Sequence, residues 1–272
     1  MELGQIGIWR SRNRGGADAA GAIERLGFGA LWIGGSPSID QVRPYLEASN
    51  RLPVVTGILN VWQHEPADVA AAHARITADH PNRFLLGIGI GHPEATSDYT
   101  RPLTAMREFL DGLDGAEAPV PQDERLLAAV GPKMLDLAGE RSLGTHPYFI
   151  TLEHTFRARE RLGEDVLVAP EVAVVLDPNP ESARKTAREY ATLYLGLSNY
   201  TKNLLEYGFS EDDFRDGGSD KLIDAVIPHG SPERVAAYIE AHLDAGADHV
   251  CIQPLGSDEP TRDYAALAAV LL

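Results

Sequence analysis

Short apolar runs alternate along the chain with longer stretches in which apolar residues recur every three or four positions. The first of these runs are Ile6–Trp9, Ala30–Ile33, Pro53–Ile58 and Phe84–Ile90. Near-continuous apolar runs of this length are typical of parallel strands that are covered on both faces. The pattern therefore predicts four parallel strands in the first third of the chain.

A helical pattern follows each of these predicted strands. The segments are Ala17–Leu26, Asp40–Asn50, Ala67–Asp79 and Arg101–Leu113. Repeated strand–helix units predict right-handed crossovers and helices on the outside of a parallel sheet.

The second half of the chain continues the same order. Further strands are predicted at Arg125–Val130, His146–Ile150, Val166–Leu176 and Asp248–Gln253. Pro170 lies inside the third of these, and a proline within a strand indicates a bend or an unpaired position. Eight strands that alternate with helices predict an α/β fold, a (β/α)8 TIM barrel, as a single domain over residues 1–272.

The helices of this half have clear start signals. They are predicted from Pro132, after the N-cap Thr151, and at Pro180–Leu197, Ser231–Ala245 and Thr261–Leu272. Residues 199–222 contain aromatic and charged side chains without a clear period. We expect this segment to be a helical excursion over one end of the barrel, inserted before the last strand.

Two helix starts in the middle of the chain are candidate anion sites. Lys133 lies beside the first turn, and His146, Thr151 and His154 lie beside the second. Free backbone N–H groups and the positive end of the helix dipole gather at such places. Ordinary helix capping explains the same residues, and the spacing alone favours it.

Charge and composition exclude several classes of function. The net charge of −16 argues against a nucleic-acid partner, which requires a concentrated basic surface. No apolar run is long enough to span a bilayer, so no membrane role is predicted. The N-terminal residues lack the zones of a signal peptide, which predicts a cytoplasmic protein. Cys251 is the only cysteine, and no Cys/His spacing resembles a metal site.

In a (β/α)8 barrel the chemistry lies on the loops that follow the strands. Asn60, His64 and Glu65 fall on one such loop, and His92 and Glu94 fall on the next. Histidines and carboxylates brought together there would be able to exchange protons. Solvated loop side chains are the alternative, and Glu65 with Glu94 would also suit a glycosidase if their separation is right.

Glycines mark the ends of the third and fourth strands. Gly87, Gly89 and Gly91 alternate along one side of the fourth strand, and Gly57 precedes Ile58 near the end of the third. Such glycines allow either close packing of neighbouring backbone or the approach of a flat ligand, and a β-bulge is the simpler explanation of Gly57. Neither the dinucleotide fingerprint G-x-G-x-x-G nor a Walker A sequence occurs.

With these features assembled, the sequence resembles the luciferase-like monooxygenase superfamily, and within it the actinobacterial coenzyme F420-dependent oxidoreductases. The matching runs cover nearly the whole chain: LLGIGIGHPE (85–94), GPKMLDLAGERSLGTHPYFITLEH (131–154), LVAPEVAVVLD (167–177), LSNYTKNLLEYGF (197–209), DGGSDKLIDAVIPHG (216–230) and AHLDAGADHVCIQPL (241–255).

The resemblance implies a deazaflavin or flavin at the carboxyl ends of the strands. It places a non-prolyl cis peptide at Gly57–Ile58 against the central ring, and lets Gly89 and Gly91 admit the ring system. It assigns the phosphate and side chain of the cofactor to the two anion-site turns. The implied cofactor-binding residues are Gly57, Ile58, Asn60, Gly89, Gly91, Gly131, Pro132, Lys133, Met134, His146, Pro147, Tyr148, Thr151, Glu153 and His154.

The chemistry implied is hydride transfer between C5 of F420 and a small organic substrate, in either direction. His64, His92 or Glu94 would handle the proton as the catalytic group. Trp9, Trp62 and Tyr99 would bind an apolar or planar substrate, although aromatic residues of this kind also serve as core. No metal is implied, and a homodimer is expected.

The sequence departs from this family in one loop. Several F420-dependent barrels carry an acidic residue or a histidine just after strand two, where this chain has Gly34–Gly35–Ser36–Pro37. The proton donor must then lie elsewhere, or the reaction differs. An FMN-dependent monooxygenase and a cofactor-binding barrel without turnover are the two alternatives.

Overall fold

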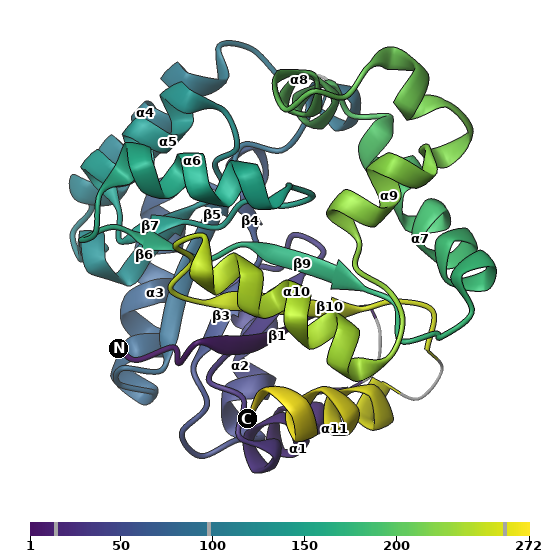
Figure 1. The fold of residues 1–272 in the computed structure, drawn as a ribbon. Helices are drawn as coiled ribbons and strands as arrows, with labels where there is room; N and C mark the ends of the chain where they lie inside the picture. Colours follow the sequence, from purple (N-terminus) through teal and green to yellow (C-terminus); the bar gives the residue numbers. More distant parts are fainter. Residues whose placement is uncertain (14–15, 97–98, 258–259) are drawn as a thin grey trace.

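The computed structural model describes residues 1–13, 16–96, 99–257 and 260–272. Its strands all pair in parallel and lie at the centre of the molecule (Figure 1). They are β1 (Ile6–Ser11), β2 (Leu31–Gly34), β3 (Val54–Thr56), β4 (Leu59–Asn60), β5 (Phe84–Gly89), β6 (Arg125–Leu127), β7 (Gly144–Thr145), β8 (Leu167–Val168), β9 (Glu171–Val174) and β10 (Val250–Pro254).

Two of the eight barrel strands are each divided into two segments. β8 and β9 are separated by Ala169–Pro170, as the proline predicted, and β3 and β4 are separated by Gly57–Ile58. β8 pairs with β7, and β9 pairs with β10. The Ala169 N–H donates to the Thr145 carbonyl at 2.9 Å, and the Cys251 N–H donates to the Pro170 carbonyl at 2.9 Å. These bonds close the sheet, and the predicted (β/α)8 barrel is confirmed.

In the ranges that the structure describes, eight helices surround the barrel, as their arrangement in Figure 1 shows. They are α1 (Ala19–Leu26), α2 (Ile39–Glu47), α3 (Pro66–Asp79), α4 (Pro102–Asp114), α5 (Pro132–Arg141), α6 (Leu152–Leu162), α10 (Pro232–Asp244) and α11 (Pro260–Leu271). Outward strand residues such as Ile33 and Val54 pack against these helices. Inward residues such as Trp32, Leu85 and Cys251 fill the barrel itself. Within the described ranges, no helix is long and apolar enough to cross a membrane.

The predicted excursion before the last strand is confirmed. Over the predicted residues 199–222 it contains α8 (Ser198–Glu206), a 3-10 segment (Glu211–Gly217) and the start of α9 (Asp220–Val226). It is larger than predicted, because α7 (Pro180–Leu195) also stands with these helices apart from the barrel helices in Figure 1. Two backbone bonds hold its ends together: the Val175 N–H donates to the Pro228 carbonyl at 3.1 Å, and the Gly230 N–H donates to the Val175 carbonyl at 3.0 Å.

The strand predicted at His146–Ile150 is wrong. The sixth barrel strand is β7, Gly144–Thr145, and residues 146–150 form the loop that follows it. Phe149 has φ of 49°, a left-handed conformation that no strand contains. Its ring stacks on Tyr194 of α7 at 4.9 Å. The aromatic pattern that resembled a strand therefore serves packing against the inserted helices.

Candidate functional site

A cis peptide bond and two aromatic side chains form the floor of the barrel mouth. The bond between Gly57 and Ile58 is cis, as the resemblance implied. Trp9 Nε1 donates to the Tyr148 hydroxyl at 3.2 Å, and both side chains are buried. A Cβ atom at Gly57 would lie 2.9 Å from Trp9 Nε1 and 3.0 Å from Tyr148 Oη. A side chain at Gly57 would therefore require Trp9 or Tyr148 to move.

Trp9 also explains the glycines after strand two. A Cβ at Gly34 would lie 1.8 Å from Cζ2 of the Trp9 indole. The ring occupies the place that a side chain at Gly34 would need. The resemblance led us to expect an acidic residue or a histidine just after strand two, and the indole of Trp9 fills the space beside Gly34 at this point.

Close packing accounts for Gly87 and Gly89, the two glycines of the fourth barrel strand β5. A Cβ at Gly87 would lie 1.9 Å from the Thr56 carbonyl oxygen, and one at Gly89 would lie 2.4 Å from Cδ1 of Ile58. The space beside Gly89 is filled by the Ile58 side chain. Gly91 has φ of 65°, beside the Asn60 amide.

The two loops that carry the predicted catalytic residues lie side by side, as expected. Asn60 pairs with Gly89 where β4 meets β5, and Trp62 Nε1 donates to the Ile90 carbonyl at 2.5 Å. The Trp62 ring also contacts Tyr99, with centroids 5.8 Å apart. Two predicted substrate residues therefore meet on these loops, whereas Trp9 lies inside the barrel mouth.

His92 and Glu94 hold the inserted helix α8. The exposed Glu94 carboxylate accepts the Ser198 N–H at 3.0 Å, and this bond lowers the pKa of Glu94. His92 Nδ1 lies 3.4 Å from the Asn199 amide nitrogen. Burial lowers the pKa of His92, and Glu94 partly offsets this. The half-buried His64 has its pKa lowered by burial as well.

The two predicted anion-site turns are both helix starts. Gly131, Pro132 and Lys133 are exposed at the start of α5, Met134 is half-buried, and no side chain caps this end. Thr151 is the N-cap of α6, and its hydroxyl accepts the His154 N–H at 3.2 Å, as predicted.

A pocket of about 400 Å³ lies beside the start of α5. Its walls come from α5, α6 and the end of α8. They are Val130, Pro132, Leu135, Arg157, Glu160, Arg161, Asn203, Glu206 and Tyr207. The exposed Glu153, which was predicted to bind the cofactor, forms an ion pair with Arg157 at 2.8 Å instead.

His146 and His154 were predicted at an anion site, and the structure corrects this. Both side chains are fully buried. His146 stacks on Trp32 at 4.0 Å with Nδ1 against the Ala169 carbonyl, and burial lowers its pKa to about 3. His154 Nε2 contacts the Val130 carbonyl at 2.9 Å, and burial lowers its pKa to about 4. Both rings are neutral and buried, so neither ring offers a positive charge to an anion. Pro147 between them is buried as well.

Sequence reasoning missed a buried acid in the barrel. Glu171 of β9 is 2 % exposed, and burial raises its pKa to about 8, although the Tyr190 hydroxyl and the Phe149 N–H partly offset this. Tyr190 of α7 lies 3.4 Å from Glu171 Oε1 and 2.9 Å from the Tyr194 hydroxyl. A glutamate inside the apolar run VAPEVAVV was the available signal, because ionised side chains are rarely buried without a partner.

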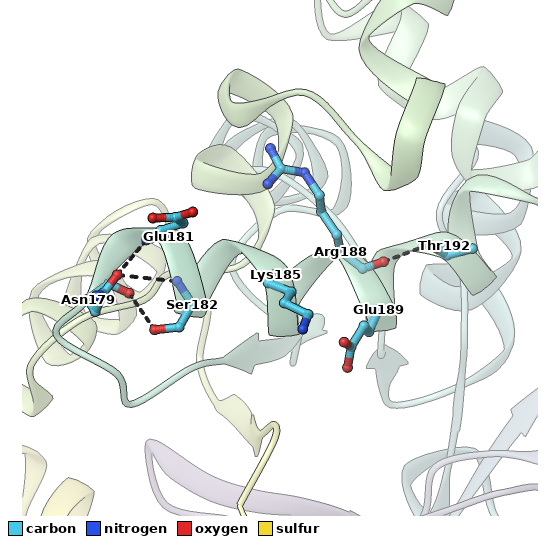
Figure 2. A pocket seen from close by; sticks show the side chains of 7 residues that line it. All are labelled: Asn179, Glu181, Ser182, Lys185, Arg188, Glu189 and Thr192. Carbon is cyan, nitrogen blue, oxygen red and sulfur yellow. Dashed lines mark hydrogen bonds between the residues drawn. The ribbon is translucent and has the colours of Figure 1, made fainter.

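A second pocket, of about 640 Å³, lies along α7. All of its lining side chains come from α7 and its N-cap Asn179 (Figure 2). Arg188 is bound to the Gly218 carbonyl and to Asp220, away from Lys185 and Glu189. The pocket contains no residue of the barrel mouth. Among the residues that the structure describes, no group of three or more His, Cys, Asp or Glu is placed to hold a metal ion.

Comparison with known proteins agrees with this architecture. A 5,10-methylenetetrahydromethanopterin reductase of Methanolobus tindarius is 24% identical over 298 aligned positions, covering 89% of this chain and 91% of the relative. An F420-dependent glucose-6-phosphate dehydrogenase of Amycolatopsis mediterranei is 24% identical, covering 78% of this chain and 76% of the relative.

Solved structures share the fold at lower identity. An F420-dependent secondary alcohol dehydrogenase, in complex with an F420–acetone adduct, superposes with a TM-score of 0.77 at 16% identity and 98% coverage of both chains. The sequence profile of the luciferase-like monooxygenases matches residues 11–249. The chain belongs to the luciferase-like monooxygenase family.

Proposed function

We propose that the protein is an F420-dependent oxidoreductase that transfers a hydride between C5 of the deazaflavin and a small organic substrate. The observation that carries the proposal is the narrow site at Gly57 in the barrel mouth, where a Cβ would lie 2.9 Å from Trp9 Nε1 and 3.0 Å from Tyr148 Oη. The two relatives named for methylenetetrahydromethanopterin reduction and for F420-dependent dehydrogenation support it.

The residues of the mouth fit such a cofactor. Gly57 and Ile58 offer backbone and an aliphatic side chain to a flat ring, and Asn60 and Gly91 adjoin them. The exposed start of α5 supplies free N–H groups and the cation Lys133 to a phosphate. F420, when bound, supplies the hydride chemistry, and the protein positions it and excludes water.

The three residues that we predicted to transfer the proton, His64, His92 and Glu94, differ in their burial and in their hydrogen-bond partners. Glu94 is already engaged by the Ser198 N–H at the start of α8. His64 and His92 have lowered pKa values because of burial. Both are therefore neutral at pH 7 and able to accept a proton from an alcohol-type substrate.

A fluorescence titration of the purified protein with F420, and separately with FMN, tests the proposal. We expect saturable binding of F420 and much weaker binding of FMN. Tighter binding of FMN than of F420 would indicate a flavin monooxygenase instead, because the same helix starts would bind an FMN phosphate. Binding of neither would favour a barrel without turnover.

The predicted homodimer and the predicted cytoplasmic location stay predictions. Sedimentation velocity across a range of protein concentrations would measure whether the protein is a homodimer. A subunit mass of 29.4 kDa at all concentrations would contradict the dimer.

A further inference from the structure

The cluster around Glu171 is unexplained by the proposed cofactor site. Glu171 points into the barrel from β9, and its Oε2 has no hydrogen-bond partner among the described residues. A buried carboxylate oxygen without a partner costs free energy, whereas a neutral carboxylic acid costs far less. The location therefore favours the protonated form of this side chain.

The hydrogen bonds that the Tyr190 hydroxyl can make also favour a protonated Glu171. The Tyr190 hydroxyl has one hydrogen and three oxygen neighbours: Gln253 Oε1 at 3.0 Å, Tyr194 Oη at 2.9 Å and Glu171 Oε1 at 3.4 Å. Gln253 Oε1 can only accept, so it takes the Tyr190 hydrogen. Tyr194 can donate to Tyr190. The Glu171 contact then has a hydrogen only if Glu171 itself carries it.

The cluster connects the barrel interior to accessible space. Glu171 is buried, whereas Tyr190, Tyr194 and Gln253 are only half-buried. Of the two half-buried tyrosines, Tyr190 is the one whose hydroxyl contacts Glu171. Tyr148, which lies beside Gly57 in the barrel mouth, is also one of the groups that face Glu171. The Glu171–Tyr190 contact is long, which is common for catalytic hydrogen bonds before a substrate is bound.

Resting on the proposed function, we propose that Tyr190 is the catalytic proton donor of the site, that Glu171 is the positioning residue that restores its proton, and that the substrate is a carbonyl compound or the corresponding alcohol. A carbonyl oxygen gains a negative charge when a hydride reaches its carbon, and a hydroxyl donor stabilises that charge.

The atoms and electrons of the step balance. The carbonyl carbon would receive a hydride, with its two electrons, from bound reduced F420, so that a C–H bond forms as the C=O π bond breaks. The carbonyl oxygen replaces Gln253 Oε1 as the acceptor of the Tyr190 hydroxyl hydrogen, takes that proton and becomes an alcohol. Glu171 returns a proton to Tyr190 and becomes a carboxylate, which solvent then reprotonates. The reverse sequence oxidises the alcohol.

A concerted relay also suits the electrostatics of the cluster. The ionisable groups that face Glu171 are Tyr148 from the loop after β7, Tyr190 and Tyr194 from α7, Tyr200 from α8 and Cys251 from β10. Each has its pKa raised by burial and by Glu171, so a phenolate at Tyr190 would be unstable there. Because Glu171 gives Tyr190 a new proton as the first one leaves, no phenolate forms at Tyr190.

The first test needs neither cofactor nor substrate. Infrared spectra at pH 6.5 should show the C=O stretch of a neutral carboxylic acid that is lost in Glu171→Gln and retained in the matched control Glu189→Gln. Glu189 is exposed on the outer pocket of α7 (Figure 2). Spectra in which Glu171→Gln removes only a carboxylate band would overturn the proposal.

The second test follows the oxidation of reduced F420 by acetone and by cyclohexanone. We expect Tyr190→Phe and Glu171→Gln to slow it by about 10²-fold, the lower end for general acid catalysis, with less than a twofold change in F420 affinity. Glu189→Gln should match the wild type. The wild-type rate should fall as the pH rises through about 8, as Glu171 loses its proton, and the rate of Glu171→Gln should not.

Several outcomes of the second test would overturn the proposal. A wild-type rate in Glu171→Gln or Tyr190→Phe would do so, as would a loss of rate confined to His92→Asn. F420 binding without oxidation by either ketone would exclude the carbonyl class. Failure to bind F420 at all would instead reject the proposed function, and the infrared experiment would still report the proton on Glu171.

Discussion

Trp9 and Gly34 show how one residue pair changes the chemistry available at a barrel mouth. The indole lies where a side chain at Gly34 would lie, and it points Nε1 at Tyr148 beside the cis peptide. An aromatic ring with one N–H donor thus fills the space where the family resemblance led us to expect a proton-transferring side chain. A proton donor has to come from another strand, and Glu171 on β9 with Tyr190 on α7 is the pair we propose.

Gly34→Ala should destabilise the protein because its Cβ would lie 1.8 Å from the Trp9 ring. We expect a loss of about 1–3 kcal/mol in the free energy of unfolding, typical of overpacking, measured by urea unfolding. Gly196→Ala is the matched control, since φ there is −79° and the nearest atom would be 3.4 Å away. Equal stability of the two variants would show that Trp9 moves aside without cost.

Lys133→Ala should weaken F420 binding without affecting folding, because Lys133 is the exposed cation at the uncapped start of α5. The loss of one exposed phosphate contact should raise the dissociation constant about five- to tenfold. Lys185→Ala, an exposed lysine on α7, is the control. An unchanged dissociation constant in Lys133→Ala would remove this residue from the site.

At the scale of elements, α8 links the inserted segment to the barrel loops. Glu94 accepts the Ser198 N–H at its start, and Tyr200 contacts both His92 and Phe149, with ring centroids 5.2 and 6.1 Å apart. The helix therefore connects the loop after β5 with the loop after β7. Its position decides how the barrel mouth is covered on this side.

Glu94→Ala should loosen the first turn of α8, because one N–H at the helix start loses its acceptor. Hydrogen exchange of the amides around Ser198 should become roughly two- to fivefold faster, while β-strand amides stay unchanged. Glu94→Gln keeps an acceptor oxygen and should exchange nearly as slowly as the wild type. Unaltered exchange in Glu94→Ala would mean that other contacts alone hold α8.

Elements with a strong period were predictable, and the short ones were not. Long amphipathic helices such as α3 and α10 and apolar strands such as β5 were found from sequence pattern. β7 has only two residues, so its position depends on pairing with β6 and β8, which no local pattern reports. The left-handed Phe149 is set by packing on α7, which lies far away in the sequence.

In the candidate site, too, some features were predictable from the sequence and others were not. The cis Gly57–Ile58 bond and the neighbouring loops followed from motif and topology. The burial of His146 did not, because His146 directly follows a two-residue strand, which gives no alternation from which to read the facing side. Glu171 was visible as a charge in an apolar strand, and its tyrosine partners come from the insertion, whose sequence has no period.

For the whole molecule, buried histidines set the dependence of stability on pH. Burial lowers the pKa to about 3 or 4 in each of His73, His146, His154, His242 and His249. Between these values and the ordinary pKa of 6.5, the unfolded chain binds protons that the folded protein excludes. Stability therefore rises with pH up to about 6.5 and falls as the pH drops below it.

We expect the free energy of unfolding to decrease steeply between pH 6.5 and pH 4, by at most about 1.4 kcal/mol per pH unit for each histidine. Glu171 acts with the opposite sign, because its pKa is raised to about 8 and its burial costs more as the pH rises above 4.5. Urea unfolding at several pH values measures the slope. A free energy of unfolding that is flat from pH 5 to pH 7 would contradict the neutral, buried state of these histidines.

The bonds of Val175 to Pro228 and to Gly230 have a consequence for how such a protein diversifies. They bring the two ends of residues 176–228 to one point on the rim of the barrel. Because the two ends of this segment lie next to each other, it can be lengthened, shortened or exchanged for another without shifting the register of any strand. We call residues 176–228 a cassette for this reason. The half of the proposed proton relay that lies on α7 belongs to this cassette, whereas Glu171 belongs to the barrel. A descendant could thus inherit the acid and acquire a new donor in a single recombination.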